Sequence, residues 1–230
     1  MNLVLDSVRL GRGNWSLTAQ GRFEKGIHLV TGEVGSGKST LALALAGLLP
    51  PESGTITSSG IVSRMLSFQF PEFHVTGSTI GEECQSWGLD PDTVLSHVNL
   101  QGKREFSPHS LSRGELKRLH LACIFAKDYE LLILDEPFSS LDCREKMLAC
   151  KNISSRAPGI TIIFAHEQSI FPRVDFLWEI RNGSLNFVGR MPEDLFQWTR
   201  APHFIRNLID AGKIPRNISP DDLMEAACRT

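Results

Sequence analysis

The stretch from Gly32 to Thr40, GEVGSGKST, limits the possible folds more than any other part of the sequence. It fits the pattern G-x-x-x-x-G-K-[ST], in which glycines let backbone N–H groups turn inward and the next helix directs its positive end at the same point. Apolar runs at 27–30 and 41–46 flank it, as a strand and a helix would. The alternative is a chance glycine-rich turn, but a random chain of this length contains the pattern only about 1% of the time. We therefore predict a phosphate-binding loop (P-loop) between a strand and a helix.

Single residues of this loop have distinct expected roles. Lys38 can reach the β- and γ-phosphates of a nucleotide, and the Ser39 hydroxyl can bind Mg²⁺. The other residues expected to contact the nucleotide here are Gly32, Gly35, Ser36, Gly37 and Thr40.

Composition and charge exclude several classes of function. The chain has 230 residues, enough for one domain or for one domain with a small appendage. Its net charge of −2 and pI of 6.4 give no electrostatic basis for binding nucleic acid. Its cysteines form no C-x-x-C pair, which favours reduced cytosolic thiols over disulfides or a zinc site. Asp6 interrupts the N-terminal apolar run, and no apolar stretch is long enough to span a bilayer, so we expect neither a signal peptide nor a transmembrane helix.

Buried strands followed by polar residues predict an α/β fold. LLILD at 131–135 and ITIIFA at 160–165 are apolar almost throughout, which is typical of central parallel strands. Asp135, Glu136 and His166 come at the carboxyl ends of these strands, where such sheets bind ligands.

The remaining elements follow from periodicity and from turn residues. We expect short strands at 3–30, two strands within 55–70, a hairpin that turns at Asn182-Gly183, and a mostly helical tail from 192 to 230. Helices are expected at 38–49, within 71–110, at 113–126 and at 143–155.

The two carboxylates after the first buried strand suggest hydrolytic chemistry. Asp135 is placed to hold Mg²⁺ through water, and Glu136 to accept a proton from an attacking water. The alternative for Asp135 is an ordinary capping acid beyond a strand.

The segment LSRGELKR, from Leu111 to Arg118, begins a helix with a recognisable cap. Ser112 is the expected N-cap, and Glu115 completes a capping box with it. Two interpretations stay open: a cap alone, or a second anion site made by the Ser112 hydroxyl and the Gly114 N–H.

Taken together, these motifs resemble the ATPase subunit of ATP-binding-cassette (ABC) transporters along nearly the whole chain. The six elements occur in the family's order: the P-loop, Gln69 in the Q-loop SFQFPE, the signature motif LSRGE, the Walker B strand LLILDEP, the D-loop SSLD at 139–142, and the switch histidine His166 in FAHE.

The resemblance implies a fold and a division of the chain. The fold would be that of a P-loop ABC ATPase, α/β with an N-terminal antiparallel subdomain. The ATPase domain would span 1–196, with a helical subdomain inserted at about 71–126, and 197–230 would form a short helical extension.

The resemblance also implies roles and partners. Two such ATPases, identical or paralogous, would pack head to tail with ATP and Mg²⁺ between them, on the cytoplasmic side of a membrane and bound to transporter subunits. Ser112 and Gly114 would contact the nucleotide of the partner. Glu136, His166 and Gln69 would be catalytic, and Ser39, Gln69 and Asp135 would surround the metal. Gln69 would also couple to the membrane subunits.

A finer resemblance concerns FQFPEFHVTGSTIGEE and the tail ISPDDLMEAACRT. Both are similar to segments of the ATPases of energy-coupling-factor transporters, which take up vitamins and transition-metal ions. The alternative for the tail is a helix that packs on its own domain.

Several positions depart from the family pattern. Arg113 replaces a glycine and could either add charge near a phosphate or point to solvent. Glu115 replaces a glutamine, which the capping box explains. The adenine-stacking aromatic is uncertain, because Arg12 falls near its place and Trp15 follows close behind.

Two other functions compete with transport. A chromosome- or ribosome-associated ATPase of the same superfamily would carry a long coiled coil or a second cassette. Only about 40 residues separate Gln69 from Leu111, without heptads. A GTP-binding switch would carry an N-K-x-D guanine motif, which this sequence lacks.

Overall fold

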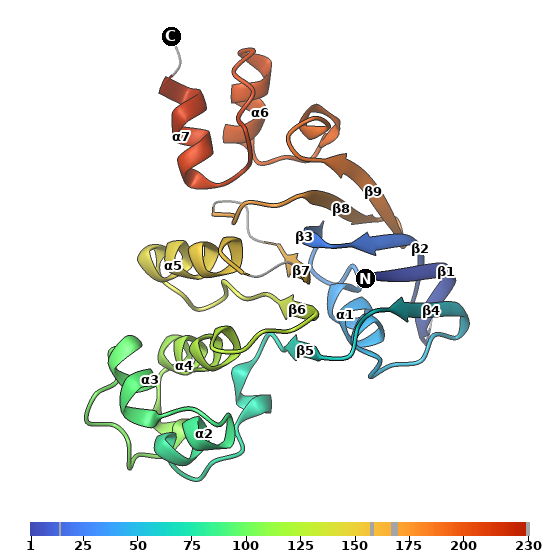
Figure 1. Cartoon of the computed structure of the whole chain (residues 1–230). Helices are drawn as coiled ribbons and strands as arrows, with labels where there is room; N and C mark the ends of the chain where they lie inside the picture. Colours follow the sequence, from blue (N-terminus) through green and yellow to red (C-terminus); the bar gives the residue numbers. More distant parts are fainter. Residues whose placement is uncertain (14, 157–158, 167–169, 229–230) are drawn as a thin grey trace.

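The computed structural model describes residues 1–13, 15–156, 159–166 and 170–228, built around one mixed sheet of nine strands (Figure 1). The strand order is β4-β1-β2-β9-β8-β3-β7-β6-β5. The strands are β1 Asn2–Arg12, β2 Trp15–Glu24, β3 Gly26–Gly32, β4 Ser53–Ser59, β5 Arg64–Ser67, β6 Leu131–Asp135, β7 Ile160–Ala165, β8 Phe176–Arg181 and β9 Ser184–Arg190. The α-helices are α1 Lys38–Ala46, α2 Ile80–Ser86, α3 Pro91–His97, α4 Arg113–Phe125, α5 Cys143–Ser154, α6 His203–Asp210 and α7 Pro220–Cys228, and 3-10 turns span Pro71–His74, Pro108–Ser110 and Leu195–Gln197.

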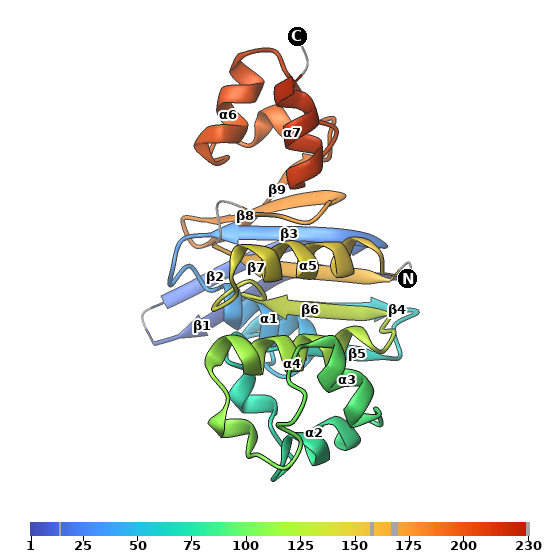
Figure 2. The same cartoon turned by 90° about the vertical axis from the view of Figure 1, so that its left-hand side faces the viewer.

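The centre of the sheet is parallel, and both of its faces are covered. β3, β5, β6, β7 and β8 run in one direction, while β1, β2 and β4 form an antiparallel part. Successive side chains of a strand point to opposite faces. Accordingly, Leu131 and Ile133 share a core with α1, and Leu132 and Leu134 share another with α5. Figures 1 and 2 show α1 on one face and α4 and α5 on the other. The predicted α/β fold is confirmed.

One expectation from the sequence needs correction, and one arrangement of strands goes beyond what the sequence predicted. The helix after the P-loop was expected to reach residue 49, but it ends at Ala46, because Gly47 takes a left-handed conformation (φ 81°) that caps it. The strands β4 and β5 are close in sequence but lie at opposite edges of the sheet. β4 pairs with β1, and β5 pairs with the buried β6, whose neighbours the sequence does not identify.

The segment between β5 and β6 forms a helical region with its own core. α2, α3 and α4 contribute most of the buried residues of this core, and the three helices lie in the lower part of Figure 2. It includes Ile80 and Cys84 of α2, Leu95 of α3 and Leu119 of α4. No helix of the described residues is long and apolar enough to cross a membrane.

The C-terminal helices pack on the same domain. Ile205, Ile218 and Leu223 belong to the core that contains α5. Buried Asp222 accepts two hydrogen bonds from the Arg173 guanidinium, at 2.7 and 2.9 Å. This packing agrees with the interpretation of the tail as part of its own domain.

His28 is a fully buried histidine on β3. Its Nε2 donates to the Glu24 carbonyl (2.8 Å), its Nδ1 accepts from Trp178 (3.1 Å), and its ring stacks on Phe176 at 4.4 Å. A ring that accepts at Nδ1 is neutral. Burial lowers the pKa of His28 to about 4, although the Glu24 carbonyl opposes the shift.

This histidine makes stability depend on pH. The pKa of His28 in the folded state lies below its value in the unfolded state, so the unfolded state binds more protons as pH falls. The contribution of neutral His28 to the unfolding free energy is therefore full above about pH 6.5 and is lost toward pH 4. We expect His28 to account for about 2 kcal/mol of the loss in unfolding free energy between pH 7 and pH 5. Urea unfolding at several pH values across this range measures the unfolding free energy, and its slope against pH should be shallower for His28→Gln than for wild type. His97→Gln, at an exposed position, should keep the wild-type slope, and an equal slope in both variants would contradict the assignment.

Candidate functional site

The P-loop forms the predicted turn between β3 and α1. Gly35 (φ 81°) and Gly37 (φ 103°) take left-handed conformations that other residues adopt only with strain. The Ser36 N–H donates to the Glu33 carbonyl at 3.1 Å, which closes the turn. Gly37 is the N-cap of α1, and no side chain caps the helix. The first N–H groups of α1 are therefore available for an anion.

Lys38 is buried at the centre of the site. Its ammonium donates to the carbonyls of Gly32 (2.9 Å) and Glu33 (3.0 Å) and lies 3.7 Å from Glu136 Oε1. The carbonyl bonds hold the chain of Lys38 folded back over the loop. The contact with Glu136 joins the P-loop to the end of β6.

Asp135, the last residue of β6, has an unsatisfied oxygen. Its Oδ1 is buried without a hydrogen-bond partner among the described residues. Burial raises the pKa of Asp135, and a hydrogen bond from the Ser39 side chain opposes this shift. A buried, unpaired carboxylate oxygen beside a hydroxyl is the kind of oxygen donor that Mg²⁺ requires. Ser39 and Asp135 therefore fit a Mg²⁺ site.

Glu136 is held in an uncommon backbone conformation. Its φ of 48° is left-handed, and its N–H donates to the Phe164 carbonyl on β7 at 2.9 Å. This conformation costs about 1–3 kcal/mol and persists where the surroundings impose it. It places the carboxylate between Lys38 and His166, whose Nδ1 lies 2.8 Å from Glu136 Oε1. The His166 side chain is half exposed, so it faces both the carboxylate and solvent.

The structure brings only part of the predicted site together. Lys38, Ser39, Asp135, Glu136 and His166 form one cluster. In the described part of the chain, neither a hydrogen bond nor an ion pair joins this cluster to Gln69, Ser112 or Gly114. The remaining predicted nucleotide contacts, Gly32, Gly35, Ser36, Gly37 and Thr40, belong to the P-loop and the first turn of α1.

The signature segment has the predicted capping box. Ser112 Oγ accepts from the Glu115 N–H, and the Glu115 carboxylate accepts from the Ser112 N–H at 2.9 Å. Lys103 adds an ion pair to Glu115 at 2.6 Å, which the sequence did not indicate. The bond from Lys103, together with those from Ser112, lowers the pKa of Glu115 to about 2. Arg113 is exposed beside Ser112, which is compatible with both alternatives for it.

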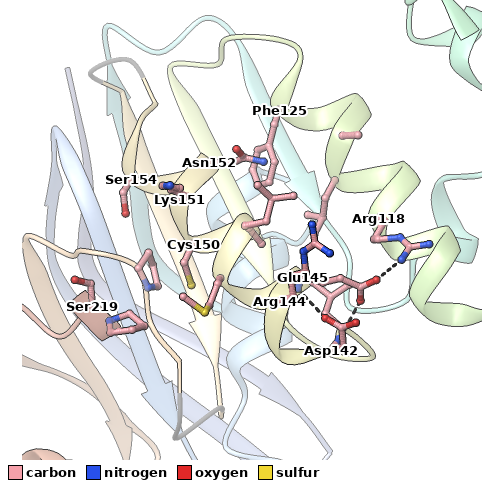
Figure 3. Close-up of a pocket in the computed structure, with 18 of the residues that line it drawn as sticks. Arg118, Phe125, Asp142, Arg144, Glu145, Cys150, Lys151, Asn152, Ser154 and Ser219 are labelled. Carbon is pink, nitrogen blue, oxygen red and sulfur yellow. Dashed lines mark hydrogen bonds and ion pairs between the residues drawn. The ribbon is translucent and has the colours of Figure 1, made fainter. Parts of the chain in front are cut away.

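The signature helix also contacts the helix after the D-loop. Arg118 of α4 pairs with Glu145 of α5, and the Glu145 carboxylate accepts from the N-cap residue Asp142. Figure 3 shows these residues at the edge of a cavity of about 640 Å³ between α4 and α5. Gly114 lies against the same segment, since an added Cβ would approach the Ser140 carbonyl to 2.8 Å. The signature motif and the D-loop are thus neighbours.

Trp15, rather than Arg12, has an observed place at the P-loop. A Cβ added to Gly37 would come within 2.2 Å of Trp15 Cζ2, so the indole ring covers the loop where α1 begins. The side chain of Arg12 lies outside the described residues. A second feature that sequence reasoning missed is Arg200 of the C-terminal segment, which donates to Glu33 of the P-loop at 2.9 Å.

Comparison with known proteins indicates a family. The family model described as "ABC transporter" matches residues 21–139. The chain is 33% identical to the energy-coupling factor transporter ATP-binding protein EcfA1 of Thermotoga maritima over 217 residues, which cover 84% of this chain and 83% of the relative. It is 30% identical to the EcfA1 protein of Bacillus subtilis, with 74% of this chain and 68% of the relative covered.

Solved structures show the same fold. A protein described as an ATP binding subunit of an ABC transporter aligns with a TM-score of 0.68 and 17% identity, over 99% of this chain and 100% of that one. A protein described as a cobalt transport ATP-binding protein aligns with a TM-score of 0.64 and 24% identity, over 80% and 78% of the two chains. At these identities the likeness concerns the fold alone.

The position of Trp15 yields a test of base recognition. If its ring stacks on the base of a bound nucleotide, Trp15→Ala loses a contact of about 1–3 kcal/mol, and the dissociation constant for ATP should rise about tenfold. Trp15→Phe should retain most of the affinity. Arg12→Ala is the matched variant at the competing position and should change the constant less than about twofold. Calorimetric titration with ATP checks all three, and a loss confined to Arg12→Ala would reverse the assignment.

Proposed function

This chain belongs to the ABC transporter family as an ATP-binding and ATP-hydrolysing subunit, and on that premise we propose that it energises an energy-coupling-factor transporter. Such a transporter takes up a vitamin or a transition-metal ion through separate membrane subunits, and this chain would sit peripherally at the cytoplasmic side of the membrane. The similarity to two EcfA1 proteins supports this transporter class. The cobalt transport protein with the same fold is compatible with it.

One observation carries the hydrolytic part of the proposal. The buried Lys38 ammonium, the Glu136 carboxylate and the His166 ring meet beside the P-loop, with Glu136 Oε1 at 3.7 Å from Lys38 Nζ and 2.8 Å from His166 Nδ1. A cation for the phosphates, a carboxylate for the water and a histidine that orients the carboxylate are the parts that phosphoryl transfer needs.

The residues would act in a simple hydrolysis. A water would attack the γ-phosphorus of ATP and give its proton to Glu136, while the bond from that phosphorus to the bridging oxygen breaks and that oxygen leaves on ADP. Lys38 would exchange its carbonyl partners for phosphate oxygens, and His166 would hold the Glu136 carboxylate toward the water. Ser39, Asp135 and Gln69 would hold Mg²⁺, which neutralises phosphate charge when bound.

Ser112 and Gly114 have a different proposed target. They sit at the exposed start of α4 without a bond to the P-loop of their own chain, so we assign them to the nucleotide of a second ATPase subunit packed head to tail. The helix start directs N–H groups at that phosphate. Identical and paralogous partners are both compatible with one intact set of motifs.

The Q-loop offers a surface for the membrane subunits. Phe70 lies within it and Phe73 follows it directly; the two residues are 46% and 73% exposed, and their ring centroids are 6.1 Å apart. Exposed aromatic residues of this kind are enriched at protein interfaces. We assign this pair to the contact with a membrane scaffold subunit.

Purification of the native complex tests the transport proposal. The tagged chain would be recovered from membranes in mild detergent, and its partners identified by mass spectrometry. A large membrane scaffold with a small substrate-binding membrane protein is the expected result, and the ligand of the small protein would name the substrate. Paired large permeases would contradict the energy-coupling-factor class, and ribosomes or soluble proteins alone would contradict transport.

The hydrolytic roles are tested by a pair of substitutions. Glu136→Gln keeps the shape but removes the base, so we expect ATP binding within about threefold of wild type, hydrolysis slower by about 10²–10⁴-fold, and a stable ATP-bound dimer. Lys38→Ala should instead lose ATP binding. Size exclusion with ATP and a phosphate-release assay measure these outcomes. Hydrolysis by Glu136→Gln at the wild-type rate would exclude Glu136 as the base.

A further inference from the structure

Lys117 on α4 is a second buried lysine, and the proposed hydrolysis does not use it. Its side chain is 1% exposed, in a helix whose other buried residues are mainly apolar. A buried ammonium is unfavourable unless hydrogen bonds and nearby negative charges compensate it. Its partners therefore indicate why a lysine occupies this position.

Those partners are two backbone carbonyls of the Q-loop. Lys117 Nζ donates to the Gln69 carbonyl at 3.0 Å and to the Phe68 carbonyl at 3.3 Å. Both residues belong to the segment directly after β5, where the chain leaves the sheet. The ammonium thus holds the main chain of Gln69, not its side chain.

A neighbouring side chain of α4 holds the same segment. His120 follows Lys117 by one helical turn, and residues with this spacing share a helix face. Its Nε2 lies 3.3 Å from the Ser67 hydroxyl. His74, after the Q-loop, accepts from the Phe68 N–H at 3.0 Å and stacks on His120 at 4.2 Å. Hydrogen bonds from α4 therefore hold the chain from Ser67 to Gln69, and His74 binds the same segment from its other side in sequence.

The negative charges around Lys117 come from the hydrolytic site and from Glu72 of the Q-loop. Burial lowers the pKa of Lys117 to about 8, while the negative charges of Asp135, Glu136 and Glu72 oppose that shift. Lys117 consequently lies within electrostatic reach of the carboxylates at the end of β6.

We propose that Lys117 is a positioning residue that fixes Gln69 to the signature helix. Ser112 is the N-cap of α4, and Lys117 follows it by little more than one turn. The two hydrogen bonds from Lys117 to the Q-loop carbonyls, here called the clamp, therefore make the start of that helix and the Q-loop move together. Gln69 at one nucleotide and Ser112 at the partner's nucleotide would then be coupled through a single helix. This inference rests on the proposed roles of Gln69 and Ser112.

The test compares three substitutions with a matched control. Lys117→Met fills similar volume but cannot donate, and Lys117→Arg can donate to both carbonyls. Lys117→Gln keeps amide N–H donors but is shorter and carries no charge. Lys127→Met is the control, because Lys127 lies two residues beyond the end of α4 and is exposed. Steady-state ATPase activity of the complex with its membrane partners gives kcat, KM for ATP and the half-saturating Mg²⁺ concentration. Hydrogen exchange of the isolated chain reports on residues 68–74.

We expect Lys117→Met to lower kcat about 10- to 100-fold, because displacement of a positioning group by about 1 Å has effects of this size. KM for ATP should stay within about threefold because the P-loop is untouched, and the Mg²⁺ requirement should rise. Residues 68–74 should exchange faster. Lys117→Arg should recover kcat to within about fivefold of wild type, Lys117→Gln should fall between, and Lys127→Met should match wild type in both measurements.

Several results would overturn the proposal. One is a folded Lys117→Met protein with wild-type kcat and unchanged exchange at 68–74. Another is equal loss in Lys117→Met and Lys117→Arg together with a raised KM, which indicates general disruption. If Lys117→Met does not fold, wild-type kcat in Lys117→Gln overturns it as well. An inactive wild-type complex would instead refute the proposed ATPase roles, while the exchange measurement still decides whether the clamp exists.

Discussion

The Lys38 ammonium is the point at which the sheet, the P-loop and the hydrolytic residues meet. It is buried, so its charge must be satisfied inside the protein. The carbonyls of Gly32 and Glu33 supply hydrogen bonds, and Glu136 supplies a negative charge at 3.7 Å. The loop conformation and the place of Glu136 therefore depend on each other through this one side chain.

The topology of the sheet makes this meeting possible. β3, β7 and β6 are parallel neighbours, so the P-loop, His166 and the Asp135-Glu136 pair leave the sheet at the same edge. The bond from the Glu136 N–H to the Phe164 carbonyl continues the β6–β7 pairing by one residue and holds the left-handed conformation of Glu136. The strained residue is thus supported by two fully buried strands.

Polar contacts join the helical region to the Q-loop and the D-loop near the site, beside the apolar packing of Leu121 and Ile124 of α4 in the core that contains α5. The helical region has its own core. Lys117 and His120 hold the Q-loop, and Arg118 holds the start of α5 through Glu145. Such contacts are directional and few, so a small rotation of α4 would change both the Q-loop and the D-loop at once. Arg200 similarly ties the C-terminal segment to Glu33 of the P-loop.

The sequence by itself determined the local chemistry. The P-loop, the buried strands at 131–135 and 160–165, the capping box of Ser112 and the turn at Asn182-Gly183 all depend on neighbours in the chain, and the structure has each of them. Tertiary structure alone decided which distant residues meet. Periodicity shows that β5 is a strand but not that β6 is its partner, and glycine spacing identifies the P-loop but not the indole of Trp15 over Gly37. The contacts of Lys117, Lys103 and Arg200 could not be predicted from the sequence either. A lysine or arginine in a sequence does not show whether the fold will bury it against a carbonyl or a carboxylate or leave it in water.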